Sequence, residues 1–145
     1  MKKKICLLTA FAIVIIATSY YIIGNPFVAY NNYRLKQKVH GISKTEVTLN
    51  EIVPFEWDVV YTFPPYTSCP EIENIIGVKS KAIRETVNEG MVHLIFVKGD
   101  SVSASVCAYV ESLGYRIDFS DKVEFGENKL FEVRIQDGIV CLTER

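Results

Sequence analysis

The position of Cys69 gives the sequence its clearest argument for reactivity. The residues Ser68-Cys-Pro-Glu71 form a capping box, which predicts the start of a short helix that ends at Gly77. A thiol at the beginning of a helix is expected to have a lowered pKa, because the helix dipole favours the thiolate. No partner base accompanies Cys69. We therefore predict that it contacts a binding partner and that it is not catalytic.

Two carboxylates and one imidazole are the other candidates for chemistry. Glu56 and Asp58 fall on one face of a predicted strand, opposite Trp57, where exposure to solvent explains them more simply than an acid–base pair does. His93 lies in the run MVHLIFV, where it fills one position on a sheet face. None of the three is predicted to be a site residue.

Motifs of known catalytic, phosphate-binding or metal sites are absent from the sequence. It contains no G-x-S-x-G, no HExxH, no Gly-rich phosphate loop, no EF-hand and no pair of Cys and His at zinc-ligand spacing. We therefore predict no catalytic residue, no cofactor and no metal, and we expect that the protein is not an enzyme.

The aromatic residues before Cys69 predict a core strand followed by a rigid turn. Trp57, Tyr61 and Phe63 alternate along the chain with period two, so they are expected to point together into the core. The dipeptide Pro64-Pro65 ends this strand and stiffens the turn that follows. Tyr66 is then presented at the surface. We predict Tyr66, together with Cys69, as residues that bind a protein partner.

The N-terminal residues 1–24 predict a signal-anchor, or a signal peptide, with a transmembrane helix. The run from Ile5 to Ile23 has no charge, and about 20 apolar residues are needed to cross a membrane. Three lysines before this run place the N-terminus in the cytoplasm and the C-terminal domain outside, as a single-pass protein of the cell membrane. Ala17-Thr18-Ser19 offers a cleavage site, and the protein is secreted if the leader is removed there. A buried core helix is the remaining alternative.

Residues 25–44 predict a membrane-proximal arm and linker, and residues 45–145 an extracytoplasmic α+β domain. Asn25 caps a helix that begins with Pro26. After Gly77, short strand-like runs are separated by Gly turns at 80–87, 91–97, 102–110, 115–119, 130–135 and 139–142. We therefore predict an antiparallel sheet of about five to seven strands with one short helix on one face. Residues 106–113 also suit a helical turn, and a Cys107–Cys141 disulfide is an alternative to free thiols.

The distribution of charge argues against nucleic acid as a partner. Residues 1–38 carry six basic side chains and no acid, whereas the rest of the chain holds 10 basic side chains against all 17 acidic ones. Phosphate binding requires a basic surface, which this acidic part does not predict.

The pattern F-x-W-D-x-x-Y-x-F-x-P-Y-T resembles one found in small bacterial envelope proteins, which are short lipoproteins or single-span proteins. It covers about 25 residues, and an I-x-x-I-I-G-like helix end follows it. Its positions here are Phe55, Trp57, Asp58, Tyr61, Phe63, Pro65, Tyr66 and Thr67, with Ile72, Ile75, Ile76 and Gly77 at the helix end. The resemblance implies an envelope location but no activity and no site residue, and the chain lacks a lipobox.

Together these features predict a membrane-anchored extracytoplasmic protein that acts as a non-enzymatic binding or interaction module for an unidentified protein partner. An immunity or exclusion factor is a sharper version of this expectation, drawn by analogy. The alternatives are a structural subunit of a membrane complex and an envelope enzyme that uses Cys69 or the Glu56/Asp58 pair.

Overall fold

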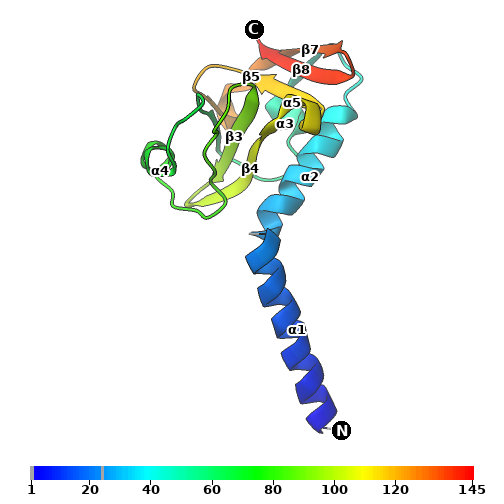
Figure 1. The fold of residues 1–145 in the computed structure, drawn as a ribbon. Coiled ribbons are helices and arrows are strands. Elements are labelled where there is room, and N and C mark those ends of the chain that lie inside the picture. Colours follow the sequence, from blue (N-terminus) through cyan, green and yellow to red (C-terminus); the bar gives the residue numbers. More distant parts are fainter. Residues whose placement is uncertain (1, 24) are drawn as a thin grey trace.

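The computed structural model describes residues 2–23 and 25–145, and it describes the side chains of residues 6–18 and 25–145. Its helices are α1 (Lys2–Ile23), α2 (Pro26–His40), α3 (Leu49–Ile52), α4 (Cys69–Ile76), α5 (Val110–Leu113) and the 3-10 helix η1 (Phe125–Glu127). Its strands are β1 (Glu46–Thr48), β2 (Val59–Thr62), β3 (Met91–Lys98), β4 (Ser101–Tyr109), β5 (Tyr115–Asp118), β6 (Lys122–Glu124), β7 (Leu130–Gln136) and β8 (Ile139–Glu144). Helix α1 extends away from the other elements (Figure 1).

Within the described part of the chain, the strands form two four-stranded sheets. The first sheet has the order β1-β7-β8-β5 and the second has the order β4-β3-β2-β6. All neighbours are antiparallel except β5 and β8, which run parallel with Tyr115 opposite Val140. The α+β class is confirmed, but the single antiparallel sheet with one short helix is wrong. Gly turns mark where a strand ends and do not determine which strand it pairs with.

The turns and helix ends follow from local sequence. Asp137 and Gly138 both have positive φ angles, of 49° and 79°, as a tight hairpin turn requires. The Ser68 hydroxyl accepts a hydrogen bond from the Glu71 N–H, and Gly77 ends α4 in the left-handed conformation with φ 73°. Asn25 caps α2 by accepting from the Phe27 N–H at 3.0 Å. These caps confirm the predicted helix starts.

The main core lies between the two sheets. It contains Trp57, which is 3% exposed and meets Phe96 edge-on at 6.0 Å between ring centroids. Phe131 and Leu142 of the first sheet are fully buried in the same cluster. The sequence predicted that Trp57 belongs to the strand and follows its alternation of inward and outward side chains. Trp57 instead precedes β2, so this alternation does not extend to it.

A second apolar cluster lies on the outer face of the second sheet. Ile72 of α4 packs there against Ile95 of β3, and Tyr61 and Phe63 stack on each other beside it. The prediction that Trp57, Tyr61 and Phe63 share one core is therefore wrong. Trp57 belongs to the main core between the sheets, whereas Tyr61 and Phe63 pack against the second cluster on the outer face. Residues 78–87, which we call the strap, close this cluster with Ile83. The strap contains neither helix nor strand, although a strand was expected at 80–87.

Helix α2 packs along the edge of the second sheet. Val28, Asn32, Leu35 and Val39 share one face of the helix, and the three apolar members are buried. Asn32 donates from Nδ2 to the Ser105 carbonyl at 2.7 Å, and its Oδ1 accepts from the Ser105 N–H at 3.0 Å. Because β4 is an edge strand, this side chain takes the place of a neighbouring strand.

The expected membrane span is contradicted. Among the residues that the structure describes, no helix is long and apolar enough to cross a membrane. Crossing takes about 20 consecutive apolar residues. The same finding contradicts the signal-anchor, the membrane as a partner, and the location as a single-pass protein of the cell membrane. The division of the chain at residues 24 and 44 stays a prediction.

Replacing Asn32 by Ala should destabilise the fold. The substitution removes both hydrogen bonds to Ser105 and leaves its main-chain groups without partners, so we expect the free energy of unfolding to fall by about 1–3 kcal/mol. Urea denaturation measures this change. The control is Gln37→Ala on the exposed side of the same helix, which should change stability by less than about 0.5 kcal/mol. Equal effects of the two substitutions would contradict the edge-strand role of Asn32.

Candidate functional site

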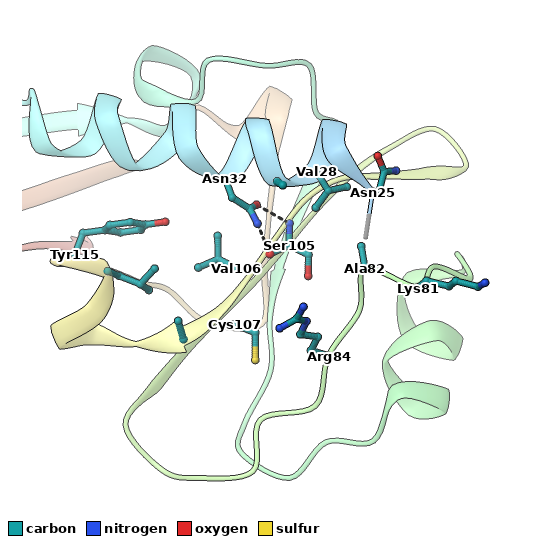
Figure 2. A pocket seen from close by; sticks show the side chains of 13 residues that line it. Asn25, Val28, Asn32, Lys81, Ala82, Arg84, Ser105, Val106, Cys107 and Tyr115 are labelled. Atoms are coloured by element: carbon teal, nitrogen blue, oxygen red, sulfur yellow. Dashed lines mark hydrogen bonds between the residues drawn. The ribbon is translucent and has the colours of Figure 1, made fainter. Parts of the chain in front are cut away.

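A pocket of about 280 Å³ lies between α2, β4 and the strap (Figure 2). Helix α2 contributes Asn32, the strap contributes Lys81 and Arg84, and β4 contributes Ser105 and Cys107. Tyr115, at the start of β5, closes one end. The wall is therefore built by segments that are far apart in the sequence.

The pocket exists because the edge of β4 is only partly covered. Asn32 occupies the main-chain groups of Ser105, and the strap approaches two residues later, where the Cys107 thiol lies 3.8 Å from the Glu85 carbonyl. Alternate residues of an antiparallel strand direct their main-chain groups to the same side. The N–H and carbonyl of Cys107 therefore point the same way as those of Ser105, towards the pocket side of the strand.

Two buried hydroxyls of the pocket wall have no hydrogen-bond partner among the described residues. Ser105 is 9% exposed and Tyr115 is fully buried, and both side chains line the cavity. Burial raises the pKa of the Tyr115 phenol far above its ordinary value, so this group remains a neutral hydrogen-bond donor. A buried hydroxyl without a partner is costly, which makes both groups candidates for contact with a ligand.

The charged side chains of the pocket are both basic. In Figure 2 the Arg84 guanidinium points towards Ser105 and Cys107, whereas the Lys81 side chain extends away from them. Neither cation forms an ion pair with any residue that the structure describes. No carboxylate belongs to the described lining, so the site has a positive charge that its own residues do not neutralise.

Cys107 and His93 are cross-strand neighbours, but they do not form an activated pair. Burial lowers the pKa of His93, and its ring nitrogens have no hydrogen-bond partner among the described residues. Burial also raises the pKa of the Cys107 thiol, although the Arg84 charge acts in the opposite direction. A nucleophilic cysteine needs a base that takes its proton. Here both groups are held neutral.

The two residues predicted to bind a partner, Tyr66 and Cys69, contact the strap but do not line the pocket. Tyr66 is 67% exposed and has a left-handed φ of 67°, while its N–H donates to the Thr86 carbonyl at 2.9 Å. The Cys69 thiol contacts the Ile83 carbonyl at 3.7 Å, and the Cys69 N–H donates to Glu85 at 2.8 Å. The strap therefore joins both predicted residues to the pocket wall.

The electrostatics of Cys69 differ from the sequence expectation. Burial raises the pKa of its thiol, and the carboxylates of Glu85 and Glu73 raise it further. The helix dipole was expected to lower this pKa, whereas the shift found is upward, with burial as its largest cause and the nearby carboxylates after it. Cys69 is therefore a poor nucleophile, and it stays only as a predicted contact residue.

The other sequence candidates have structural roles. Asp58 accepts hydrogen bonds from Lys98 at 2.7 Å and from the Gly99 N–H at 2.8 Å, which holds its pKa below the ordinary value. Its carboxylate thus braces the β3–β4 turn, and Glu56 is exposed. Cys107 and Cys141 are free thiols, so the alternative disulfide is not formed. No group of three His, Cys, Asp or Glu gathers as metal ligands within the described residues.

Sequence reasoning missed Asn32, Arg84, Ser105 and Tyr115. Asn32 did carry a signal, because it interrupts the apolar face formed by Val28, Leu35 and Val39. The other three belong to a strap, an edge strand and a strand of the opposite sheet. These three residues come together only because of how the strands pair and pack, and no local sequence pattern predicts that pairing.

Comparison with known proteins gives one partial match. No family model matches the chain, and no solved structure matches it. A protein named Endonuclease V from Sulfolobus acidocaldarius is 43% identical over 54 residues, which is 37% of this chain and 28% of the relative's length. The chain thus matches little more than a quarter of that protein. The expectation that excluded nucleic acid is contradicted by this match.

The free energy of unfolding should decrease as the pH is lowered, because His93 then becomes protonated. The lowered pKa means that the unfolded chain binds this proton more readily, so the contribution of His93 is complete above about pH 6.5 and is lost as the pH falls. The free energy of unfolding should decrease from about pH 7.5 to about pH 5.5, by at most about 1.4 kcal/mol per pH unit for one proton. The decrease should be smaller in His93→Leu, as measured by urea denaturation at each pH. The same slope in His93→Leu would contradict the assignment.

Cys69 should react slowly with an aromatic disulfide at neutral pH. Its raised pKa lowers the fraction of thiolate, which is the reacting form. Peptide mass spectrometry can follow each cysteine separately. Unfolding in urea should accelerate the reaction of Cys69, and so should Glu85→Gln, which removes a nearby negative charge. Glu89→Gln, on the exposed turn before β3, is the control. A rate above that of the unfolded chain would show that the thiol is activated instead.

Proposed function

We propose that this protein is a non-enzymatic binding module that contacts a protein partner through the surface around Tyr66. The observation that carries the proposal is the conformation of Tyr66. A bulky residue with φ 67° is strained, yet this side chain is 67% exposed and therefore gains little from packing within its own chain. Strain of this kind persists where the surrounding structure holds a residue in position, and it is concentrated at functional sites.

The turn around Tyr66 is rigid. Two prolines precede it, and the buried side chain of Thr67 donates to the Pro64 carbonyl at 2.8 Å. The hydrogen bond from the Tyr66 N–H to Thr86 fixes the same turn to the strap. A side chain that is already ordered loses little conformational entropy on binding, which favours affinity.

Two further exposed residues are linked to this turn through residues 86–88. Val87 follows the strap residue that accepts from Tyr66 and is 63% exposed. Tyr109 is 42% exposed, and its hydroxyl is bonded to Asn88 at 2.6 Å. We call Tyr66, Val87 and Tyr109 the Tyr66 surface. Tyrosines supply rigid contact area with a polar tip, and they are enriched at the centres of protein interfaces. These features support a protein as the partner.

The electrostatics of the thiols and the imidazole support a binding role over catalysis. Cys69 and Cys107 both have raised pKa values, and the pKa of His93 is lowered without a partner group. Activated nucleophiles require the opposite arrangement.

The partial match to a protein named Endonuclease V favours cleavage of nucleic acid as a second candidate function. Incubation of the purified chain with single- and double-stranded DNA and RNA, with and without Mg²⁺, tests it. Cleavage that persists through purification and is absent from a mock preparation would favour this candidate over the binding module.

The first test places a photoreactive phenylalanine analogue at position 66 in the cells that make the protein. We expect a protein to be captured at position 66 and also at Tyr109, but not at Tyr33, an equally exposed tyrosine on α2. Capture of the same proteins at position 33 would contradict a specific surface.

The second test uses the captured protein in purified form. Tyr66→Gly removes the side chain and relieves the positive φ, so the fold should be no less stable while binding weakens by about tenfold or more. Calorimetry measures the affinity, thermal unfolding measures the stability, and Tyr33→Ala is the control. Unchanged affinity in Tyr66→Gly would overturn the proposal.

A further inference from the structure

The pocket between α2, β4 and the strap is a second site, separate from the Tyr66 surface. We propose that it binds a small organic anion, whose carboxylate or phosphate group lies between the Arg84 guanidinium and the Ser105 hydroxyl. The inference does not depend on the proposed protein partner.

The charge of the pocket selects an anion. Arg84 points into the cavity and has no ion-pair partner among the described residues. By contrast, Arg116, Arg134 and Arg145 each pair with a carboxylate. A guanidinium presents several N–H donors in one plane, which matches the oxygens of a carboxylate or phosphate. An anionic group would complete the pairing that Arg84 lacks.

The buried hydroxyls supply the second, independent observation. Ser105 and Tyr115 are each more than nine-tenths buried, line the cavity and have no hydrogen-bond partner in the described part of the chain. Figure 2 shows the Tyr115 hydroxyl directed towards the pocket from its far end. Ser105 can donate to the anionic group, and Tyr115 to a polar atom at the other end of the ligand. The alternation of β4 adds the Cys107 N–H as a further donor.

The size and lining of the cavity restrict the ligand. Its volume of about 280 Å³ lies just below the range for small-molecule pockets, which begins near 300 Å³, so only a small ligand fits. Val106, Ala108 and Leu113 give the wall between Ser105 and Tyr115 an apolar character. A compact anion with a short apolar body fits this lining, whereas a divalent cation does not, because the described residues that line the pocket include no carboxylate to bind it.

The experiment follows the amide signals of the ¹⁵N-labelled full chain during titration with three probes. Sodium benzoate provides a carboxylate on an apolar ring, benzamide is its neutral analogue of the same shape, and inorganic phosphate provides the other oxyanion. We expect benzoate or phosphate to shift the amides of Ser105 and Cys107 in a saturable way, and benzamide to bind at least tenfold more weakly. Saturation by benzoate assigns a carboxylate ligand, and preference for phosphate assigns a phosphate ligand.

Four variants separate binding from folding. Arg84→Gln should weaken binding of the anion by about ten- to a hundredfold, and Arg84→Lys, which keeps the charge but loses the planar donors, should weaken it less. Ser105→Ala should weaken binding while the free protein keeps or gains stability, because its buried hydroxyl is unpartnered. Arg134→Gln, which alters an exposed arginine of the first sheet, should bind as the unaltered protein does.

Three results would overturn the inference. These are binding of benzamide as tight as that of benzoate, no shift of the Ser105 and Cys107 amides with either anion, or equal losses in Arg84→Gln and Arg134→Gln. Tyr66→Gly should leave the affinity for the anion unchanged, so the pocket and the Tyr66 surface can fail separately.

Discussion

The pair of hydrogen bonds between Asn32 and Ser105 is the interaction on which the packing of α2 against β4, and with it the pocket, depends. An edge strand presents main-chain donors and acceptors that require partners, and α2 supplies them from one amide side chain. Asn31 makes a similar contact two residues earlier on β4, where its side chain donates to the Ser103 carbonyl at 2.9 Å. These contacts determine how closely the helix approaches β4. The space that remains beyond Ser105 is the pocket.

The strap contributes to two different surfaces, the pocket and the Tyr66 surface. It has no regular structure, yet Ile83 is buried in the second cluster and Thr86 is held by Tyr66. Between these anchors the exposed Arg84 faces the pocket, and on the opposite side Glu85 contacts the start of α4. A segment that is anchored at Ile83 and Thr86 can present Arg84 and Glu85, which lie between these anchors, on its two sides. The Tyr66 surface and the anion site therefore share a support without sharing a residue.

The sequence predicted local structure well and pairing poorly. The caps at Asn25, Ser68 and Gly77 were recognised because each depends on residues within one helical turn. The division into two sheets was missed, since β1 pairs with β7 and β5 pairs with β8 across long stretches of chain. The pocket was missed for the same reason: Asn32 and Ser105 are 73 positions apart. Tyr66 was placed correctly at the surface because two prolines fix its turn locally.

The order of the first sheet has a consequence for the synthesis of the protein. Strand β8 lies between β7 and β5, so residues 139–144 occupy the interior of a sheet whose other strands precede them in the chain. Until these residues have been made, β5 has no neighbour in that sheet and Tyr115 lacks its cross-strand partner Val140. The second sheet has no such requirement, because all of its strands end by residue 124. During translation it can therefore pair before the first sheet, whose completion waits for β8.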